Sequence, residues 1–223
     1  MNVPQDSSVE LKRFNMIESQ LKPNKIIDPK IIDAFSSIPR EMFVPSNFRH
    51  VAYVDNDIAL GYNRYLLEPM VIGQMVQIAS LKLTDKVLVV ACGYGYTAAV
   101  ISKLCHKVYA LDSERMFLNH AERNFKELNL HNIQTFQGKL TEGCSIYSPY
   151  NVIFIEGSID YLPDSIPQQL EENGKIIYIR RQKNIGRMVI ATKINQIVTS
   201  QVYFDANVPS IPEFNQEKRF IFS

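Results

Sequence analysis

The stretch that most constrains this chain spans residues 86–112 and reads KVLVVACGYGYTAAVISKLCHKVYALD. An apolar run leads into a turn with two glycines, a segment of small residues that suits a helix, a second apolar run and a single acid, Asp112. This order is typical of a βαβ unit whose first loop binds a nucleoside cofactor and whose second strand ends at the ribose hydroxyls. Asp112 follows Gly93 by 19 residues, which suits that geometry.

The two glycines of this turn have a physical role in a cofactor site. Gly93 and Gly95 allow the backbone to approach a ligand closely or to adopt a positive φ. Asp112 offers a carboxylate that only accepts hydrogen bonds, as a ribose diol requires. The structural alternative is that the glycines merely form a tight turn between a strand and a helix. The correct order of strand, helix, strand and acid favours nucleoside binding.

Composition and charge exclude several classes of protein. The chain has 223 residues, enough for one large α/β domain, and its 24 basic and 23 acidic residues argue against a nucleic-acid or membrane-surface partner. No stretch approaches about 18 uninterrupted apolar residues, so we expect neither export nor a membrane span. The three cysteines form no C-x-x-C pair, which favours a cytoplasmic protein. The four histidines lack the spacing of a metal site, so no metal is expected.

Hydrophobic periodicity divides the chain into three zones, which we expect to form a single domain over residues 1–223. The first zone, residues 1–82, is a helical and irregular N-terminal extension. Its helices are expected at residues 9–21, at 29–37 with Asp28 as the cap, and at 69–81. Residues 43–63 are rich in Pro, Asn, Asp and Tyr, which predicts an irregular segment.

The middle zone, residues 83–180, alternates strand and helix patterns and holds the cofactor-binding core. This alternation predicts a doubly wound α/β fold with a mostly parallel sheet covered on both faces. Strands are expected at 87–90, 107–111, 133–137, 152–156 and 175–179, and helices at 113–128, capped by Ser113, and at 163–170. The last zone, residues 181–223, is β-rich. C-terminal antiparallel strands are expected from segments 188–192, 197–204 and 219–222, with a turn at Asn195 and Gln196.

Short motifs outside the glycine turn carry a resemblance to a known family. Residues 16–21 read MIESQL, residues 38–45 read IPREMFVP, and residues 52–55 read AYVD. In order and spacing they resemble the motifs M-V-x-x-Q-L, V-P-R-E-x-F-V-P and A-Y-x-D of the protein-L-isoaspartate O-methyltransferase family, a branch of the class I methyltransferases. The second motif is the most distinctive short signature of that family. The resemblance covers about residues 11–180.

The resemblance implies S-adenosylmethionine as cofactor and isoaspartyl residues in damaged proteins or peptides as substrates. A sulfonium carries an already activated methyl group, so such an enzyme mainly has to orient the acceptor and exclude water. An isoaspartyl α-carboxylate, with an unperturbed pKa of about 3.5, is ionised at neutral pH and needs no strong base. Its methyl ester then allows the neighbouring amide to close a succinimide, which begins repair. The oligomeric state is left open.

The resemblance also identifies candidate cofactor residues, with two departures from the family pattern. Ala91 stands where the family has its first glycine. Lys139 follows Gly138 where the family has an acid on the adenine side, and the loss of one hydrogen bond there is worth about 0.5–1.5 kcal/mol. The cofactor-binding candidates are Ala91, Gly93, Gly95, Asp112, Gly138 and Lys139.

The acceptor side departs further from the family. Residues 61–69 read GYNRYLLEP where the family has G-x-G-Q-T-I-S-Q-P, so its serine falls on Leu67, which donates no hydrogen bond. Arg64 offers a two-pronged grip on a carboxylate instead. The alternative, which we favour, is a helical pair between Arg64 and Glu68. Glu156, at the end of the fourth expected strand, either faces the ligand crevice of a doubly wound sheet, where it could contact substrate, or is a solvated carboxylate at a strand end. Candidate catalytic residues are thus Arg64, Glu68 and Glu156.

Two other functions remain open at this point. The first is a divergent homologue that binds S-adenosylmethionine with lost or altered acceptor specificity, a possibility raised by Leu67. The second is a nicotinamide oxidoreductase, because residues 93–98 also fit the pattern G-x-G-x-x-A. The sequence disfavours the oxidoreductase, since no second mononucleotide-binding half follows the first.

Overall fold

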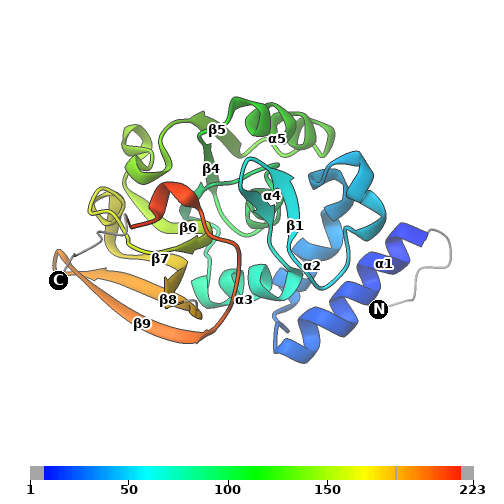
Figure 1. Cartoon of the computed structure of the whole chain (residues 1–223), viewed down its shortest axis with the longest axis horizontal. Helices are drawn as coiled ribbons and strands as arrows, with labels where there is room; N and C mark the ends of the chain where they lie inside the picture. Colours follow the sequence, from blue (N-terminus) through cyan, green and yellow to red (C-terminus); the bar gives the residue numbers. More distant parts are fainter. Residues whose placement is uncertain (1–7, 184, 217–223) are drawn as a thin grey trace, which may run out of the picture.

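A twisted sheet runs through the centre of the computed structural model, which describes residues 8–183 and 185–216 (Figure 1). Within those residues the sheet has seven strands in the order β5-β4-β3-β6-β7-β8-β9. The strands β5, β4, β3, β6 and β7 are parallel to one another, and β8 and β9 continue the sheet as antiparallel strands. Their bounds are β3 (Lys86–Val90), β4 (Lys107–Asp112), β5 (Ile133–Gln137), β6 (Tyr150–Ile159), β7 (Leu170–Gln182), β8 (Ile185–Ile194) and β9 (Ile197–Asp205).

This order confirms the predicted doubly wound, mostly parallel sheet. The chain runs outward from β3 through β4 to β5, then returns to the other side of β3 for β6 and β7. A ligand crevice in such a sheet lies outside the carboxyl ends of the strands, where the order reverses, here between β3 and β6. The predicted C-terminal antiparallel pair is also confirmed, with Asn195 and Gln196 at positive φ in its turn. The expected strand at residues 219–222 lies outside the described residues.

The helices lie close to their predicted positions. They are α1 (Ser8–Met16), α2 (Pro29–Ser37), α3 (Pro69–Ala79), α4 (Tyr96–Ser102) and α5 (Arg115–Glu127). The first predicted helix continues past α1 as a π-helical turn, Ile17–Leu21, and a 3-10 turn, Lys22–Asn24. Asp28 caps α2 as predicted, because its side chain accepts a hydrogen bond from the Lys30 N–H.

Two helix predictions are wrong, and each has a physical reason. Ser113 is not the cap of α5, which begins after Glu114, because the Ser113 hydroxyl instead accepts a hydrogen bond from Arg64. The expected helix at 163–170 is reduced to a 3-10 turn, Pro167–Gln169. Pro167 has no N–H for the carbonyl four residues earlier, and its ring would clash there. The Gln169 side chain also donates to the carbonyls of Glu142 and Ser165, which fixes the segment in an irregular path.

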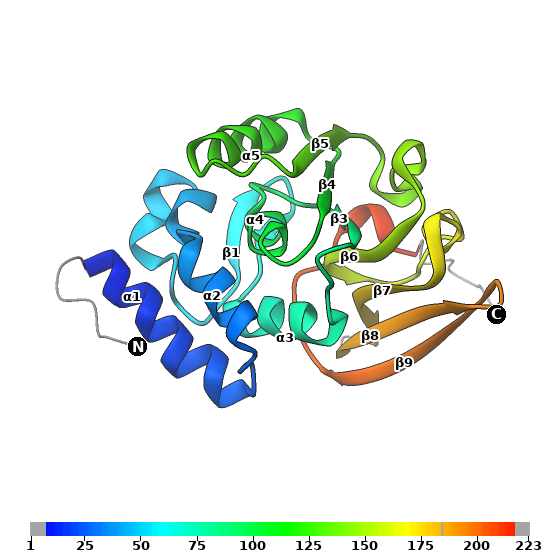
Figure 2. The same cartoon turned by 180° about the vertical axis from the view of Figure 1, so that it is seen from behind.

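The two faces of the sheet are covered unequally. Along β3, Val87 and Val89 point into a large core beneath the α-helices, while Leu88 and Val90 point into a second core on the opposite face. The second core is closed by 3-10 turns and by a C-terminal turn, Pro212–Phe214 (η8), rather than by an α-helix. The N-terminal helices α1 and α2 lie toward one end of the molecule, and β8 and β9 lie toward the other (Figures 1 and 2).

A short hairpin interrupts the segment that was expected to be irregular. It consists of β1 (Ile58–Gly61) and β2 (Arg64–Leu66), which pair in antiparallel fashion. Tyr62 and Asn63 form its turn with φ of +47° and +55°, the positive values that a tight hairpin turn requires. Before the hairpin, residues 46–51 form a 3-10 turn.

One fully buried arginine fixes the chain on either side of this hairpin. Arg40, from the motif IPREMFVP, donates through Nε to the Ala52 carbonyl and through Nη2 to the Leu67 carbonyl, both at 2.7 Å. Its guanidinium also lies 4.9 Å from the centre of the Tyr96 ring in α4. A single side chain therefore positions the β1–β2 hairpin relative to the helix that follows β3.

Candidate functional site

The turn after β3 and the acid after β4 meet at the carboxyl edge of the sheet. The Cys92 N–H donates to the Leu111 carbonyl at 3.1 Å, and the Gly93 N–H donates to Asp112 Oδ2 at 3.0 Å. We call residues 91–95 the cofactor turn. The structure thus brings together the glycines and the acid that the sequence predicted to be neighbours, because the carboxyl ends of adjacent parallel strands share one edge.

The cofactor turn depends on backbone conformations with positive φ. Ala91, Gly93 and Gly95 have φ of +62°, +51° and +88°, so the positive φ that the sequence suggested for the two glycines is present. The space around the glycines is taken by the protein itself. A Cβ on Gly95 would overlap the Phe125 ring, and a Cβ on Gly93 would lie 2.7 Å from Leu60 Cδ1. Leu60 belongs to β1, so the β1–β2 hairpin lies directly over the turn.

Asp112 is completely buried, with an exposed fraction of 0%. Its carboxylate accepts from the N–H groups of Gly93 and Glu114 at 3.0 and 3.2 Å, and from Arg64 Nε at 3.3 and 3.4 Å. Burial raises the pKa of Asp112, and the positive charge of Arg64 opposes that rise. Both oxygens of the Asp112 carboxylate therefore accept hydrogen bonds from protein groups.

Arg64 is the residue that closes this site. Its side chain is 2% exposed, and besides Asp112 it donates to Ser113 Oγ at 2.9 Å and to Glu213 Oε1 at 2.6 Å, both through Nη2. The prediction that Arg64 pairs with Glu68 is wrong, because residues 64–66 form a strand and not a helix. The described ion pairs of Arg64 are with Asp112 and Glu213. Glu213 was not predicted: it lies 149 residues from Arg64, and no local pattern connects the two.

Glu68 and Asp57 form a separate acidic pair near the start of α3. The Glu68 N–H donates to Asp57 Oδ1 at 2.8 Å. Burial raises the pKa of both carboxyl groups, and Asp57 adds its negative charge to the environment of Glu68. Among the described contacts, Glu68 has no hydrogen bond or ion pair with Asp112. The structure therefore does not join this candidate to the cofactor turn.

Glu156 is buried, so its description as a solvated strand end is wrong. It sits in a bulge of β6, where Phe154 pairs with Ile177 and the next paired residue is Ser158. Gly157 in the bulge has φ of +149°. Such bulges re-aim side chains beside active sites. Burial raises the pKa of Glu156 to about 8, the nearby charge of Asp112 adds to the rise, and Thr97 and Arg40 oppose it.

The adenine-side candidates lie after β5. The Gly138 N–H donates to the Asp112 carbonyl at 3.1 Å, which places this glycine beside the acid at the end of β4. The Lys139 side chain is exposed and forms an ion pair with Glu142 at 2.9 Å. Its backbone stays at the same edge of the sheet, but its ammonium group is bound to a surface carboxylate.

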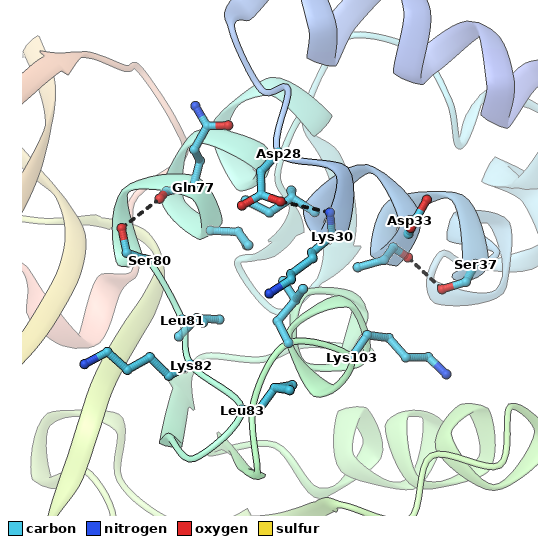
Figure 3. A pocket seen from close by; sticks show the side chains of 14 residues that line it. Asp28, Lys30, Asp33, Ser37, Gln77, Ser80, Leu81, Lys82, Leu83 and Lys103 are labelled. Atoms are coloured by element: carbon cyan, nitrogen blue, oxygen red, sulfur yellow. Dashed lines mark hydrogen bonds between the residues drawn. The ribbon is translucent and has the colours of Figure 1, made fainter. Parts of the chain in front are cut away.

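A sizeable cavity lies elsewhere. About 840 Å³ in volume, it is lined by α2, α3 and the loop before β3, and shares no residue with the cofactor turn (Figure 3). That loop precedes the strand, so the cavity lies at its amino end, away from the edge where doubly wound sheets bind ligands. In the described part of the chain, no cluster of three or more His, Cys, Asp or Glu is suited to a metal, and no helix is long and apolar enough to cross a membrane.

Comparison with known proteins identifies the family. The family described as protein-L-isoaspartate(D-aspartate) O-methyltransferase matches residues 12–212, most of the chain. The chain belongs to this family. Protein-L-isoaspartate O-methyltransferase 2 of Pelobacter propionicus is 29% identical over 177 residues, which cover 79% of each chain. Protein-L-isoaspartate O-methyltransferase of Proteus mirabilis is 31% identical over 159 residues, which cover 71% of this chain and 76% of the relative.

Solved structures of protein-L-isoaspartate O-methyltransferases share the fold. One superposes with a TM-score of 0.79 at 23% identity, over 91% of this chain and 67% of its own. A second, described as a putative member from Plasmodium falciparum in complex with S-adenosyl-L-homocysteine, has a TM-score of 0.77 at 18% identity, over 93% of this chain and 100% of its own. The likeness confirms the Rossmann-like α/β fold predicted from the sequence.

The cofactor turn makes a testable demand on Gly95. Gly61 and Gly95 both have strongly positive φ, but only Gly95 has a neighbour where a Cβ would stand. Gly61→Ala should lower the free energy of unfolding by about 1–2 kcal/mol through backbone strain alone. Gly95→Ala should lower the free energy of unfolding by a further ~1–3 kcal/mol, because the added methyl group overlaps the Phe125 ring. Urea unfolding measures both variants, and equal losses would show that the turn is not packed as described.

The burial of Glu156 predicts a pH-dependent stability. The folded protein binds the Glu156 proton more tightly than the unfolded chain, since the pKa rises from 4.5 to about 8. The resulting penalty is absent below pH 4.5, grows as the pH rises, and is complete above about pH 8. Glu156→Gln should therefore match the parent at pH 4.5 and exceed its stability at pH 9 by a few kcal/mol, on the order expected for such a shift. A difference that stays constant across this range would contradict the assigned environment.

Proposed function

We propose that this protein is an S-adenosylmethionine-dependent protein-L-isoaspartate O-methyltransferase that esterifies isoaspartyl carboxylates in damaged proteins and peptides. One observation carries the proposal. In a chain that matches the family over residues 12–212, the glycine turn after β3 is hydrogen-bonded to the acid at the end of β4, at the carboxyl edge of a doubly wound sheet. That juxtaposition is the frame of a nucleoside cofactor site.

The chemistry of the donor set fits an adenosyl cofactor. The Asp112 carboxylate is the acceptor for ribose hydroxyls, with Ala91, Gly93 and Gly95 shaping the turn against it and Gly138 bonded to its backbone. In the conformation described, Arg64 occupies the acceptor positions that a ribose would need, so the fit requires Arg64 to move. S-adenosylmethionine supplies the transferable methyl group. The protein supplies position and the exclusion of water.

Glu156 is our proposed residue on the acceptor side. Its carboxyl group is buried near Asp112 and holds its proton at neutral pH, because its pKa is about 8. A neutral carboxyl group does not repel an anionic acceptor, and its O–H donates a hydrogen bond to a carboxylate oxygen. It therefore supplies the donor that Leu67 does not. Glu68 has no described hydrogen bond to the cofactor turn, and we assign it to the acidic pair with Asp57 rather than to the reaction.

The expected partners are proteins or peptides that carry isoaspartyl residues. The compartment we propose is the cytoplasm, since Cys92, Cys105 and Cys144 are all free and buried.

A transfer assay tests the function. The purified chain is incubated with S-adenosylmethionine labelled in its methyl group and with two peptides that differ only in an isoaspartyl or an aspartyl residue. Methyl transfer to the isoaspartyl peptide, and not to its aspartyl control, is expected. Asp112→Asn should raise the KM for the cofactor about tenfold, roughly the value of a lost charge-assisted hydrogen bond, with little change in the KM for the peptide. Cofactor binding without transfer to either peptide would instead identify a homologue that has lost or changed its acceptor.

A further inference from the structure

Arg64 joins three parts of the chain that are distant in sequence. It extends from β2, lies against Asp112 at the end of β4, and holds Glu213 in η8 with both terminal nitrogens, Nη2 to Oε1 at 2.6 Å and Nη1 to Oε2 at 3.4 Å. The Nη2–Oε1 contact of 2.6 Å with Glu213 is shorter than either contact with Asp112, so the guanidinium is held mainly by the C-terminal segment. This contact positions the Nε–H of Arg64 against the Asp112 carboxylate.

The contacts of Asp112 show what this arrangement excludes. A carboxylate offers about four lone-pair positions. Two are used by the N–H groups of Gly93 and Glu114, which belong to the backbone that shapes the site. The Nε–H of Arg64 lies between the two carboxylate oxygens, with Nε 3.3 and 3.4 Å from them. Arg64 is therefore the only one of these donors on a side chain, and the one whose withdrawal would free the acid without dismantling the turn.

The β1–β2 hairpin that carries Arg64 also covers the cofactor turn. Leu60 Cδ1 lies 2.7 Å from where a Cβ on Gly93 would be. The Tyr62 and Phe117 rings pack in a T-shaped arrangement with 6.2 Å between their centres, and Phe117 belongs to α5. Hairpin residues thus contact both the turn and the helix that follows β4. A ligand that donates to the Asp112 oxygens therefore competes with Arg64, which the hairpin carries.

Glu213 stands on a firmly attached segment. The neighbouring Phe214 is fully buried in the second core, its carbonyl accepts from the Asp160 N–H, and the Ile211 N–H donates to the Ser158 carbonyl. The segment is therefore anchored to β6. This attachment to β6 does not involve the hairpin. Glu213 can therefore hold Arg64, and with it the hairpin, in a fixed position.

We propose that Arg64 and Glu213 form a latch that holds the β1–β2 hairpin closed over Asp112 and must release before the ribose of the cofactor binds there. In this arrangement Glu213 is a positioning residue: it touches neither cofactor nor substrate, and it sets cofactor affinity through Arg64. The inference rests on the proposed function for the identity of the ligand. The closed position of the hairpin follows from the contacts of Arg64 with Asp112 and Glu213, whatever the ligand is.

The variant Glu213→Gln tests the latch, with Asp205→Asn as the matched control. Asp205 in β9 also forms an ion pair with an arginine, Arg187 in β8. Neither residue has a described contact with the cofactor turn. Glu213 is 37% exposed, so a glutamine is accommodated there. Titration calorimetry with S-adenosylhomocysteine should give a dissociation constant about threefold to tenfold lower for Glu213→Gln than for the parent, the effect of a weakened, partly exposed ion pair. The control should match the parent. The KM for S-adenosylmethionine should fall likewise while kcat stays unchanged.

Hydrogen exchange of the free protein separates the latch from the function. Amides of residues 58–66 should exchange about threefold to tenfold faster in Glu213→Gln than in the parent, and should be unchanged in the control. If exchange accelerates but no form binds S-adenosylhomocysteine, the latch stands and the proposed function fails. If exchange is unchanged, or if Glu213→Gln binds the cofactor product more weakly than the parent, the latch is overturned.

Discussion

A buried negative charge at the end of β4 is the constraint on which the site depends. Asp112 is fully enclosed, and an ionised carboxylate in such a place is tolerated only when its oxygens are paired with donors. The cofactor turn supplies one backbone N–H, the start of α5 supplies another, and Arg64 supplies the positive charge. Turn, helix and hairpin are thus held together by one carboxylate. Removing any one of these donors would leave part of that charge uncompensated.

The two buried acids of the site have different surroundings. Asp112 lies against Arg64 and two backbone donors, whereas Glu156 has burial and the charge of Asp112 acting on it and is raised to a pKa of about 8. Burial raises the pKa of both carboxyl groups, but of the two only Asp112 forms an ion pair with an arginine. Here one is suited to accept from hydroxyl groups and the other to donate to an anionic acceptor. This division fits a reaction in which a carboxylate is methylated beside a ribose-bound cofactor.

Much of this arrangement was predictable from the sequence, because it depends on local patterns. The apolar runs gave five parallel strands, and adjacent parallel strands necessarily bring Gly93 and Asp112 to one edge. The helix expected at 163–170 failed because Pro167 has no N–H to donate inside a helix. Glu156 was placed at a strand end, since nothing in the sequence shows that Gly157 adopts a bulge and that β6 continues to Ile159.

The contacts that close the site could not be predicted, because they join residues without a shared pattern. A helical spacing pairs Arg64 with Glu68, but the tight turn at Tyr62 and Asn63 makes the segment a strand and points the guanidinium elsewhere. Its partner Glu213 lies 149 residues away, on a segment positioned only by the second core. Only the folded chain brings these groups within hydrogen-bond distance.

A crystal structure of the protein with S-adenosylhomocysteine is the most direct measurement of whether Asp112 is a cofactor acid kept closed by Arg64. The ribose hydroxyls should lie within about 3 Å of the Asp112 oxygens, a normal hydrogen-bond distance. Arg64 Nε should lie well beyond the 3.3 and 3.4 Å that separate it from those oxygens in the closed arrangement. A ligand bound away from Asp112, or bound beside it with the contact between Arg64 and Asp112 intact, would contradict this assignment.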